Sequence, residues 1–158
     1  MHENIFAPKI KISHTNPFNG DKKNSFPKPD YATDGAAGLD LRACLKNPMY
    51  VYPNNTAIIG SGIAIAIDNP NIAAVLLPRS GLGIKHGIVL ANLIGLIDSD
   101  YREEIKIAIW NRSDKLFVIN HNDRICQMVF VPIIKPEFEW VPNLESNGRG
   151  GLGSTGIE

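Results

Sequence analysis

The sequence has few cysteines and no net charge, and both absences limit what the protein can be. Cys44 and Cys126 are its two cysteines, each in an apolar, strand-like context. Such a pair favours buried free thiols over a disulfide framework or a metal site. Lysine plus arginine and aspartate plus glutamate both number 16. Without a broad electric field to hold nucleic acid or an anionic membrane, any anion must be bound at a local site.

Long apolar runs are also missing. Runs such as 63–67 and 72–77 are far shorter than the roughly 20 residues of a membrane-spanning helix. The first residues lack the basic-then-apolar order of a secretory signal. We therefore expect a cytoplasmic protein with no membrane partner and no nucleic-acid partner.

Helical periodicity is scarce, whereas short alternating or β-branched runs recur along the chain. These runs predict strands at 9–13, 38–43, 49–52, 56–67, 72–78, 115–119 and 124–134. Glycines leave room for at most one or two short helical turns near residues 79–86. The pattern predicts an all-β barrel or double-sheet sandwich. Residues 1–145 should form a single domain, and 146–158 should be a flexible, glycine-rich C-terminal arm.

The stretch 87–111 is expected to be the chemical centre. It starts with an apolar run, passes a turn that carries Asp98, Asp100 and Tyr101, and ends on an alternating strand, which predicts a hairpin. Two turn aspartates are commonly just solvated, but one of them could orient and deprotonate a water. Asp40 stands in an otherwise apolar strand, where spacing leaves open whether it faces solvent or a cation.

The motif PRSGLG at 78–83 combines groups that suit a phosphate. Pro78 ends a strand, Arg79 offers a forked cation, Ser80 a hydroxyl, and Gly81 is expected to open a turn. A plain turn with a surface arginine is the commoner meaning of this motif alone. The spacing is neither that of a Walker A loop nor that of a dinucleotide-binding fingerprint.

Taken together, the segments resemble a known family. AAGLDLRA, LLPRSGLGIKHGIVLANLIGLIDSDY, RICQMVFVP and GGLGSTG, in this order, resemble the five motifs of the trimeric dUTPases, from about Pro29 to Gly156. The resemblance implies a jelly-roll-like β subunit, a homotrimer with shared active sites, and an arm that closes over the nucleotide. It also implies hydrolysis of dUTP to dUMP and pyrophosphate by water attack at the α-phosphorus, with Mg²⁺ on the triphosphate. Such an enzyme keeps uracil out of DNA and supplies dUMP for thymidylate synthesis.

The family roles can be carried over residue by residue. The resemblance makes Asp98 the general base, Gln127 a contact of the α-phosphate side or the attacking water, and Asp40 the holder of hydrated Mg²⁺ through water. Ser80 would act with Arg79 on the phosphates, next to the bond that breaks. The implied substrate-binding set is Arg79, Ser80, Gly81, Asn92, Gly95, Ile97, Tyr101, Arg149, Leu152, Gly153, Ser154 and Thr155. Within it, Asn92 and the hairpin backbone would read uracil, and Tyr101 would pack against the deoxyribose.

The C-terminal arm departs from the family pattern. Asn147 stands at the place of an arginine that clamps phosphate, and Leu152 at the place of a phenylalanine that covers uracil. Arg149, two residues after the arginine place, is our candidate replacement. A dUTP-binding regulatory protein with impaired turnover is therefore an alternative. A dCTP deaminase-type enzyme of the same fold is a further one, since Glu103 and Glu104 lie in the hairpin region.

Overall fold

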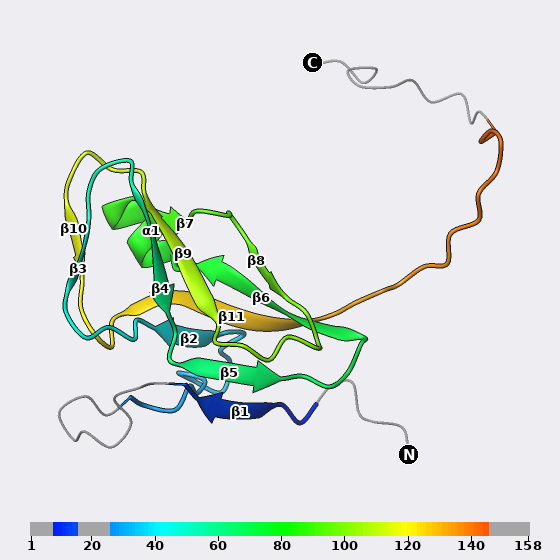
Figure 1. The fold of residues 1–158 in the computed structure, drawn as a ribbon, viewed down its shortest axis with the longest axis horizontal. Coiled ribbons are helices and arrows are strands. Elements are labelled where there is room, and N and C mark those ends of the chain that lie inside the picture. Colours follow the sequence, from blue (N-terminus) through cyan, green and yellow to red (C-terminus); the bar gives the residue numbers. More distant parts are fainter. Residues whose placement is uncertain (1–7, 16–25, 146–158) are drawn as a thin grey trace.

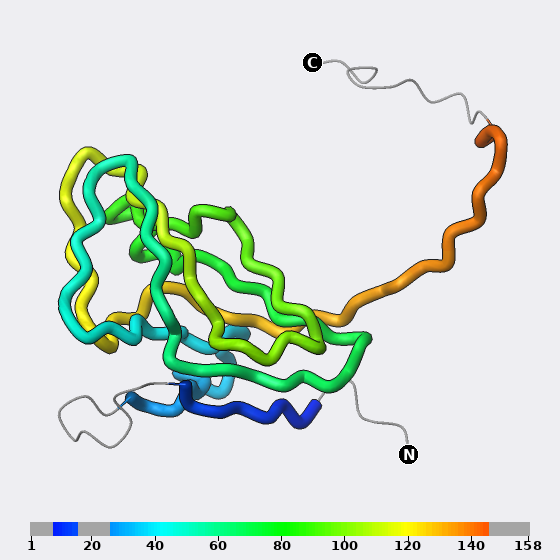
Figure 2. Tube along the Cα trace, in the orientation of Figure 1, coloured from blue at the N-terminus to red at the C-terminus, as the bar shows by residue number. Residues whose placement is uncertain are grey.

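A computed structural model describes residues 8–15 and 26–145 (Figures 1 and 2). In this part of the chain, strands dominate and one short helix occurs, which confirms the all-β prediction. The elements are β1 Lys11–His14, β2 Leu39–Arg42, β3 Met49–Val51, β4 Thr56–Gly60, β5 Ile63–Ala66, β6 Ile72–Pro78, α1 Ser80–His86, β7 Ile88–Leu90, β8 Gly95–Ile97, β9 Lys106–Asn111, β10 Phe117–Ile119 and β11 Arg124–Pro132.

The described strands form four antiparallel sheets and no closed barrel. The largest has the order β2-β11-β6-β8, and a second has the order β4-β9-β7. Two small sheets pair β1 with β5 and β10 with β3. Neighbours in the sheets are mostly distant in sequence. The long β11 pairs with β2 on one side and with β6 on the other, so it brings the ends of these two strands together.

The core lies between the sheets and is built mainly from isoleucines. In β9, the alternation of the sequence buries Ile107 and Ile109 completely while Lys106 faces outward. β6 is apolar throughout, and none of its residues is exposed, so side chains on both of its faces are at least partly buried. Branched aliphatic side chains suit these pleated, covered positions, so local preference and burial agree.

The predicted strand 56–67 is two strands. Ser61 and Gly62 interrupt it, and Gly62 has a φ of 70°, a left-handed conformation that glycine adopts without strain. The chain turns here, so that β4 pairs with β9 whereas β5 pairs with β1. The glycines on both sides of Ser61 were the sequence signal for this break.

The short helix α1 occupies the glycine-rich stretch where one or two turns were expected. It ends at Gly87, which has a φ of 67° and donates its N–H to the Leu82 carbonyl. Lys85 and His86 lie in the last turn, where positive charge complements the helix dipole. Gly81 lies inside the helix, so the expectation that it opens a turn was wrong.

The stretch 87–111 does not form the simple hairpin that its sequence predicts. Within the described chain, β7 pairs with β9, whereas β8 between them pairs with β6 in another sheet. The segment 98–105 between β8 and β9 carries Asp98 and Tyr101, and we call it the joint. It therefore connects two sheets. Alternation revealed the strands, but each strand's partner depends on residues elsewhere in the chain.

Candidate functional site

A carboxylate between two guanidinium groups lies where three strands meet. Asp40 comes from β2, Arg79 follows β6, and Arg124 opens β11. Asp40 Oδ1 lies 3.0 Å from Arg79 Nε, and Asp40 Oδ2 lies 3.1 Å from Arg124 Nη1. Arg79 Nη1 also donates to the Arg124 carbonyl over 3.0 Å. We call Asp40, Arg79 and Arg124 the arginine–aspartate cluster.

Strand pairing places Gln127 beside this cluster. In β11, Gln127 lies opposite Asp40 on one side and Leu77 on the other. Its Nε2 donates to the Pro78 carbonyl over 3.3 Å. The structure thus brings together Asp40, Arg79 and Gln127, three residues selected from separate sequence motifs.

A cavity of about 310 Å³ opens next to the cluster. It is lined by Arg79, Leu82, Phe117, Asp123, Arg124 and Ile125. Its lining holds two guanidinium groups and the Asp123 carboxylate, and Leu82 and Phe117 supply an apolar wall. Forked cations over an apolar wall suit an anionic ligand such as a phosphate. Ser80 and Gly81 are exposed immediately after Arg79.

A second group of candidate residues lies on the joint between β8 and β9. Asp98 is exposed, and its carbonyl accepts from the Tyr101 N–H at 3.2 Å. The half-buried Tyr101 donates its hydroxyl to the Glu104 carbonyl at 3.0 Å. Asn92 is exposed in the turn after β7. Gly95 lies so close to β6 that a Cβ there would come within 2.9 Å of the Leu76 Cβ, which explains the glycine.

The two groups lie at opposite ends of β6. Leu76 pairs with Gly95 and Ala74 pairs with Ile97, so Asp98 comes level with Ala73 near the start of β6, whereas Arg79 follows its end. About six residues of chain separate Ala73, beside Asp98, from Arg79, which corresponds to roughly 20 Å at about 3.3 Å per residue. Asp98 and Arg79 of one chain are therefore too far apart to act on the same phosphate.

Two residues with clear contacts were not among the predicted site residues. Arg124 shares Asp40 with Arg79, and its place three residues before Gln127 was the available signal. Glu104 accepts the Gly62 N–H at 2.9 Å, where its carboxylate also fills the space above Gly60. Glu104 thus has a structural task beside the joint. Of the predicted residues, Asn147, Arg149, Leu152, Gly153, Ser154 and Thr155 lie outside the described residues.

The described residues contain no cluster of three or more His, Cys, Asp or Glu side chains that could form a metal cage. This donor set fits Mg²⁺ only as a hydrated ion bound by a ligand's phosphates, which is the usual mode for nucleotide-bound magnesium. A carboxylate has about four acceptor positions. Asp40 therefore keeps positions for metal-bound water beyond the two that its arginines use.

The cysteines are free, as expected. Cys126 is buried and Cys44 is half-buried. Burial, with a smaller effect of the nearby Asp40 carboxylate, raises the pKa of the Cys126 thiol to about 12. Burial and then Glu104 also raise the pKa of Cys44. Both thiols are thus neutral at physiological pH.

The only helix in the described ranges, α1, is far too short to cross a membrane, and no helix there combines the necessary length with apolar character.

Fold and site define an all-β protein with an arginine-containing cavity assembled from strand ends. The family model for dUTPase matches residues 24–156. The chain is 56% identical over 135 residues to the deoxyuridine 5'-triphosphate nucleotidohydrolase of Legionella pneumophila strain Paris, covering 84% of this chain and 89% of that protein. It is 49% identical over 150 residues to the enzyme of the same name from Photorhabdus laumondii, covering 94% and 97%. The chain belongs to the dUTPase family.

Solved structures agree on the fold. A mutant dUTPase of Staphylococcus bacteriophage 80alpha, solved with dUpNHpp, superposes with a TM-score of 0.74 at 23% identity, covering 96% of this chain and all of that one. The dUTPase from phage phi11 of S. aureus superposes with a TM-score of 0.72 at 21% identity, covering 87% and 99%. At this identity the likeness establishes the architecture alone.

Proposed function

We propose that this protein hydrolyses dUTP to dUMP and pyrophosphate. The curated relatives at about half identity carry the name of that nucleotidohydrolase. The observation in the structure that best supports the proposal is the arginine–aspartate cluster beside Gln127. It offers two forked cations and an amide to a polyphosphate in an otherwise neutral protein.

In this proposal each side chain has a task that its chemistry allows. Arg79 and Ser80 bind phosphate oxygens next to the bond that breaks, and Gln127 contacts the α-phosphate or the attacking water. Asp98 accepts the proton of that water, and its exposed carboxylate is accessible for this. Mg²⁺, when bound, neutralises charge on the triphosphate, and Asp40 would hold its water ligands.

Base and sugar selection would depend on the turn after β7 and on Tyr101. Asn92 and neighbouring backbone groups can match the edge of uracil, whereas cytosine would leave such groups unpaired, which is a costly mismatch. Tyr101 offers an aromatic face to the deoxyribose. With Tyr101 packed under the sugar, the 2′-hydroxyl of a ribonucleotide would not fit. Tight packing at C5 of uracil would likewise exclude the methyl group of thymine.

We also propose a homotrimer with shared sites. Arg79 and Asp98 lie at opposite ends of β6, so Asp98 of a second copy must complete the site. Residues 133–145 leave the body as an extended segment (Figure 1), in which Ile134, Phe138 and Trp140 are at least 83% exposed. Such apolar exposure suits docking on another copy of the chain. A threefold ring, as the resemblance implies, uses this head-to-tail contact three times and closes.

Product formation from a panel of nucleotides tests the activity. With Mg²⁺, the protein should release pyrophosphate from dUTP and much less from UTP, dTTP or dCTP. Binding of dUTP without release at saturating nucleotide would instead favour the regulatory alternative. Ammonia release from dCTP would favour a deaminase, although the engagement of Glu104 by the Gly62 N–H speaks against that. The expected cytoplasmic location stays a prediction.

Mixing two inactive variants tests whether sites are shared. Arg79→Ala and Asp98→Asn should each be inactive alone. If each site takes these two residues from different subunits, random trimers formed on co-expression should regain about a quarter of the wild-type activity, because both donors are intact in about one site in four. No recovery, with mixed trimers verified by mass, would place both residues in one subunit.

A further inference from the structure

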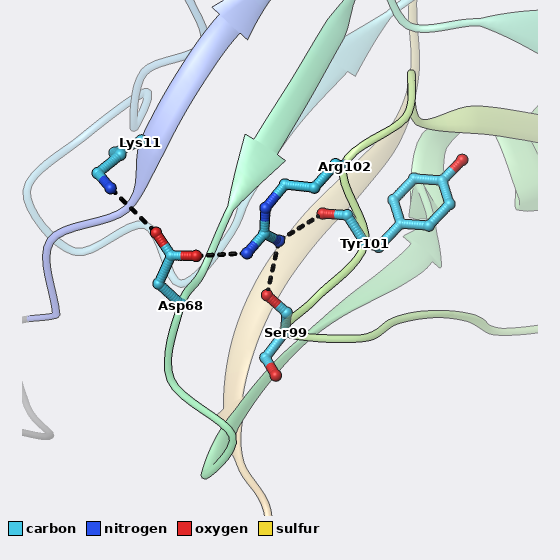
Figure 3. A network of polar contacts seen from close by, with 5 residues as sticks. All are labelled: Lys11, Asp68, Ser99, Tyr101 and Arg102. Carbon is cyan, nitrogen blue, oxygen red and sulfur yellow. Dashed lines mark hydrogen bonds and ion pairs between the residues drawn. The ribbon is translucent and has the colours of Figure 1, made fainter.

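We propose that Arg102 is a positioning residue for the reaction, and that together with Asp68 it fixes the joint that carries Asp98 and Tyr101. The inference rests on the proposed hydrolysis of dUTP. Arg102 is not among the residues expected to contact the nucleotide, and its effect would be exerted through the backbone of the joint. Figure 3 shows the contacts that carry the inference.

One nitrogen of Arg102 bonds two carbonyls of the joint. Arg102 Nη1 donates to the Ser99 carbonyl at 2.9 Å and to the Tyr101 carbonyl at 2.8 Å. Ser99 directly follows the proposed base Asp98, and Tyr101 is the proposed sugar contact. The guanidinium thus connects the backbone on both sides of Asp100 and limits how far this part of the joint can move.

Asp68 holds the guanidinium from the opposite side. Its Oδ1 pairs with Arg102 Nη2, and its backbone N–H donates to the Ser99 carbonyl at 3.3 Å. Lys11 Nζ lies 3.1 Å from Asp68 Oδ2. The bond with Lys11 and then the charge of Arg102 help keep the pKa of the Asp68 carboxyl below its usual range. Asp68 therefore stays ionised at neutral pH and retains Arg102.

The joint needs such a brace because the sheets hold it only at its ends. β8 belongs to one sheet and β9 to another. Between them, the bonds from the Tyr101 N–H to the Asp98 carbonyl and from the Tyr101 hydroxyl to the Glu104 carbonyl stay within the joint. The Asp68 N–H holds only the Ser99 carbonyl, at 3.3 Å, so Arg102 supplies the side-chain contact that also includes Tyr101. A small displacement of a general base strongly slows catalysis, since proton transfer requires close approach to the attacking water.

The expected signature separates positioning from stability. Exposed ion pairs contribute little to folding, and the Asp68 and Arg102 side chains are 46% and 47% exposed. Arg102→Ala should therefore shift the melting temperature by no more than about 4 °C. In contrast, kcat for dUTP should fall at least about tenfold, and KM should change by less than about threefold, because the joint orients the base more than it binds the nucleotide.

Three further variants make the test specific. Arg102→Lys can reach one carbonyl or Asp68 but cannot fork between them, so its kcat should lie between those of Arg102→Ala and the wild type. Asp68→Asn keeps a residue that tolerates the φ of 56° at this position and should lower kcat less than Arg102→Ala. Lys11→Ala is the matched control, because it removes a cation from Asp68 and leaves the bonds to the joint in place. Its kcat should stay within about twofold of the wild type.

Steady-state kinetics of the four folded variants decide the matter. A wild-type kcat in Arg102→Ala, or a higher KM with unchanged kcat, would overturn the proposal. An equal loss in Lys11→Ala would also overturn it, because charge around Asp68 rather than the brace would then control the rate. If the wild-type protein released no pyrophosphate from dUTP, the proposed function itself would fail, which is a separate outcome.

Discussion

Asp40 Oδ1 and Arg79 Nε lie 3.0 Å apart, although 38 positions separate the two residues in the sequence. Together with the bond from Arg79 Nη1 to the Arg124 carbonyl, the contact fixes the direction of the guanidinium at the end of β6. Preorganised cations are effective in binding phosphate because little reorganisation remains when the ligand arrives. Asp40 thus serves the proposed site before any metal or nucleotide is present.

Asp40→Asn should lower kcat/KM for dUTP by roughly 10- to 100-fold. An amide can accept from one arginine but presents N–H groups to the other, so the cluster would lose its geometry. Pyrophosphate release measured over a range of Mg²⁺ concentrations checks this prediction. Asp34→Asn, which makes the same charge change at an exposed position, should have the wild-type value. Equal kcat/KM in Asp40→Asn and the wild type would remove Asp40 from the site.

Asp98→Asn should nearly abolish turnover and leave dUTP binding in place. The amide cannot accept the water's proton, and loss of general-base catalysis typically costs about 10²- to 10⁴-fold in rate. Single-turnover hydrolysis and calorimetric binding of dUTP measure the two effects separately. A variant with normal kcat would show that another group is the base.

Leu152→Phe should lower KM for dUTP by about threefold or more, because an aromatic ring can stack on a base whereas leucine offers only apolar contact. The change affects binding, so kcat should move little. Initial rates over a range of dUTP concentrations give both values. Leu116→Phe is the control for a general effect of an added ring. An unchanged KM would indicate that position 152 does not cover uracil.

Asn111→Ala should destabilise the fold by about 2 to 4 kcal/mol. Asn111 is completely buried, and its amide donates to the Val51 and Lys115 carbonyls at 2.8 and 2.7 Å. Its oxygen accepts from the Ser113 N–H and hydroxyl. Alanine would leave these buried groups without partners. Urea unfolding checks the loss, and exposed Asn55→Ala should change the free energy by less than about 0.5 kcal/mol.

Alkaline pH should destabilise the protein through Cys126. Its pKa is about 12 in the folded chain, against 9.0 for an exposed thiol. The folded state therefore keeps a proton that the unfolded state releases above about pH 9. Below that pH, the Cys126 thiol is protonated in both states and does not lower the free energy of unfolding. Between about pH 9 and 12 the free energy of unfolding should fall by up to about 1.4 kcal/mol per pH unit. Denaturant unfolding across this range should show a shallower slope in Cys126→Ala, and equal slopes would contradict the prediction.

Much of the fold can be read from short-range pattern. Strand 72–78 was predicted to the residue, and the turns at 79–86 coincide with α1 within one residue. In these elements the residue pattern and the observed burial agree, so they can be predicted without knowing which strands they pair with. The motif order also led to the dUTPase family before any contact was known. The division of 56–67 at Ser61 and Gly62 is where the apolar alternation hid a turn that the flanking glycines signalled.

The pattern of residues along the sequence could not predict which distant strands pair. Alternation states which face of a strand is buried but not which strand lies beside it, and for this reason the expected hairpin at 87–111 became strands of two sheets. The same pairing surrounded Asp40 with Arg79 and Arg124, and it left Asp98 at the far end of β6. Residue chemistry and motif order were therefore sufficient for the family and the candidate side chains. Which of those side chains can meet was decided by the tertiary structure, because meeting depends on contacts that no local spacing encodes.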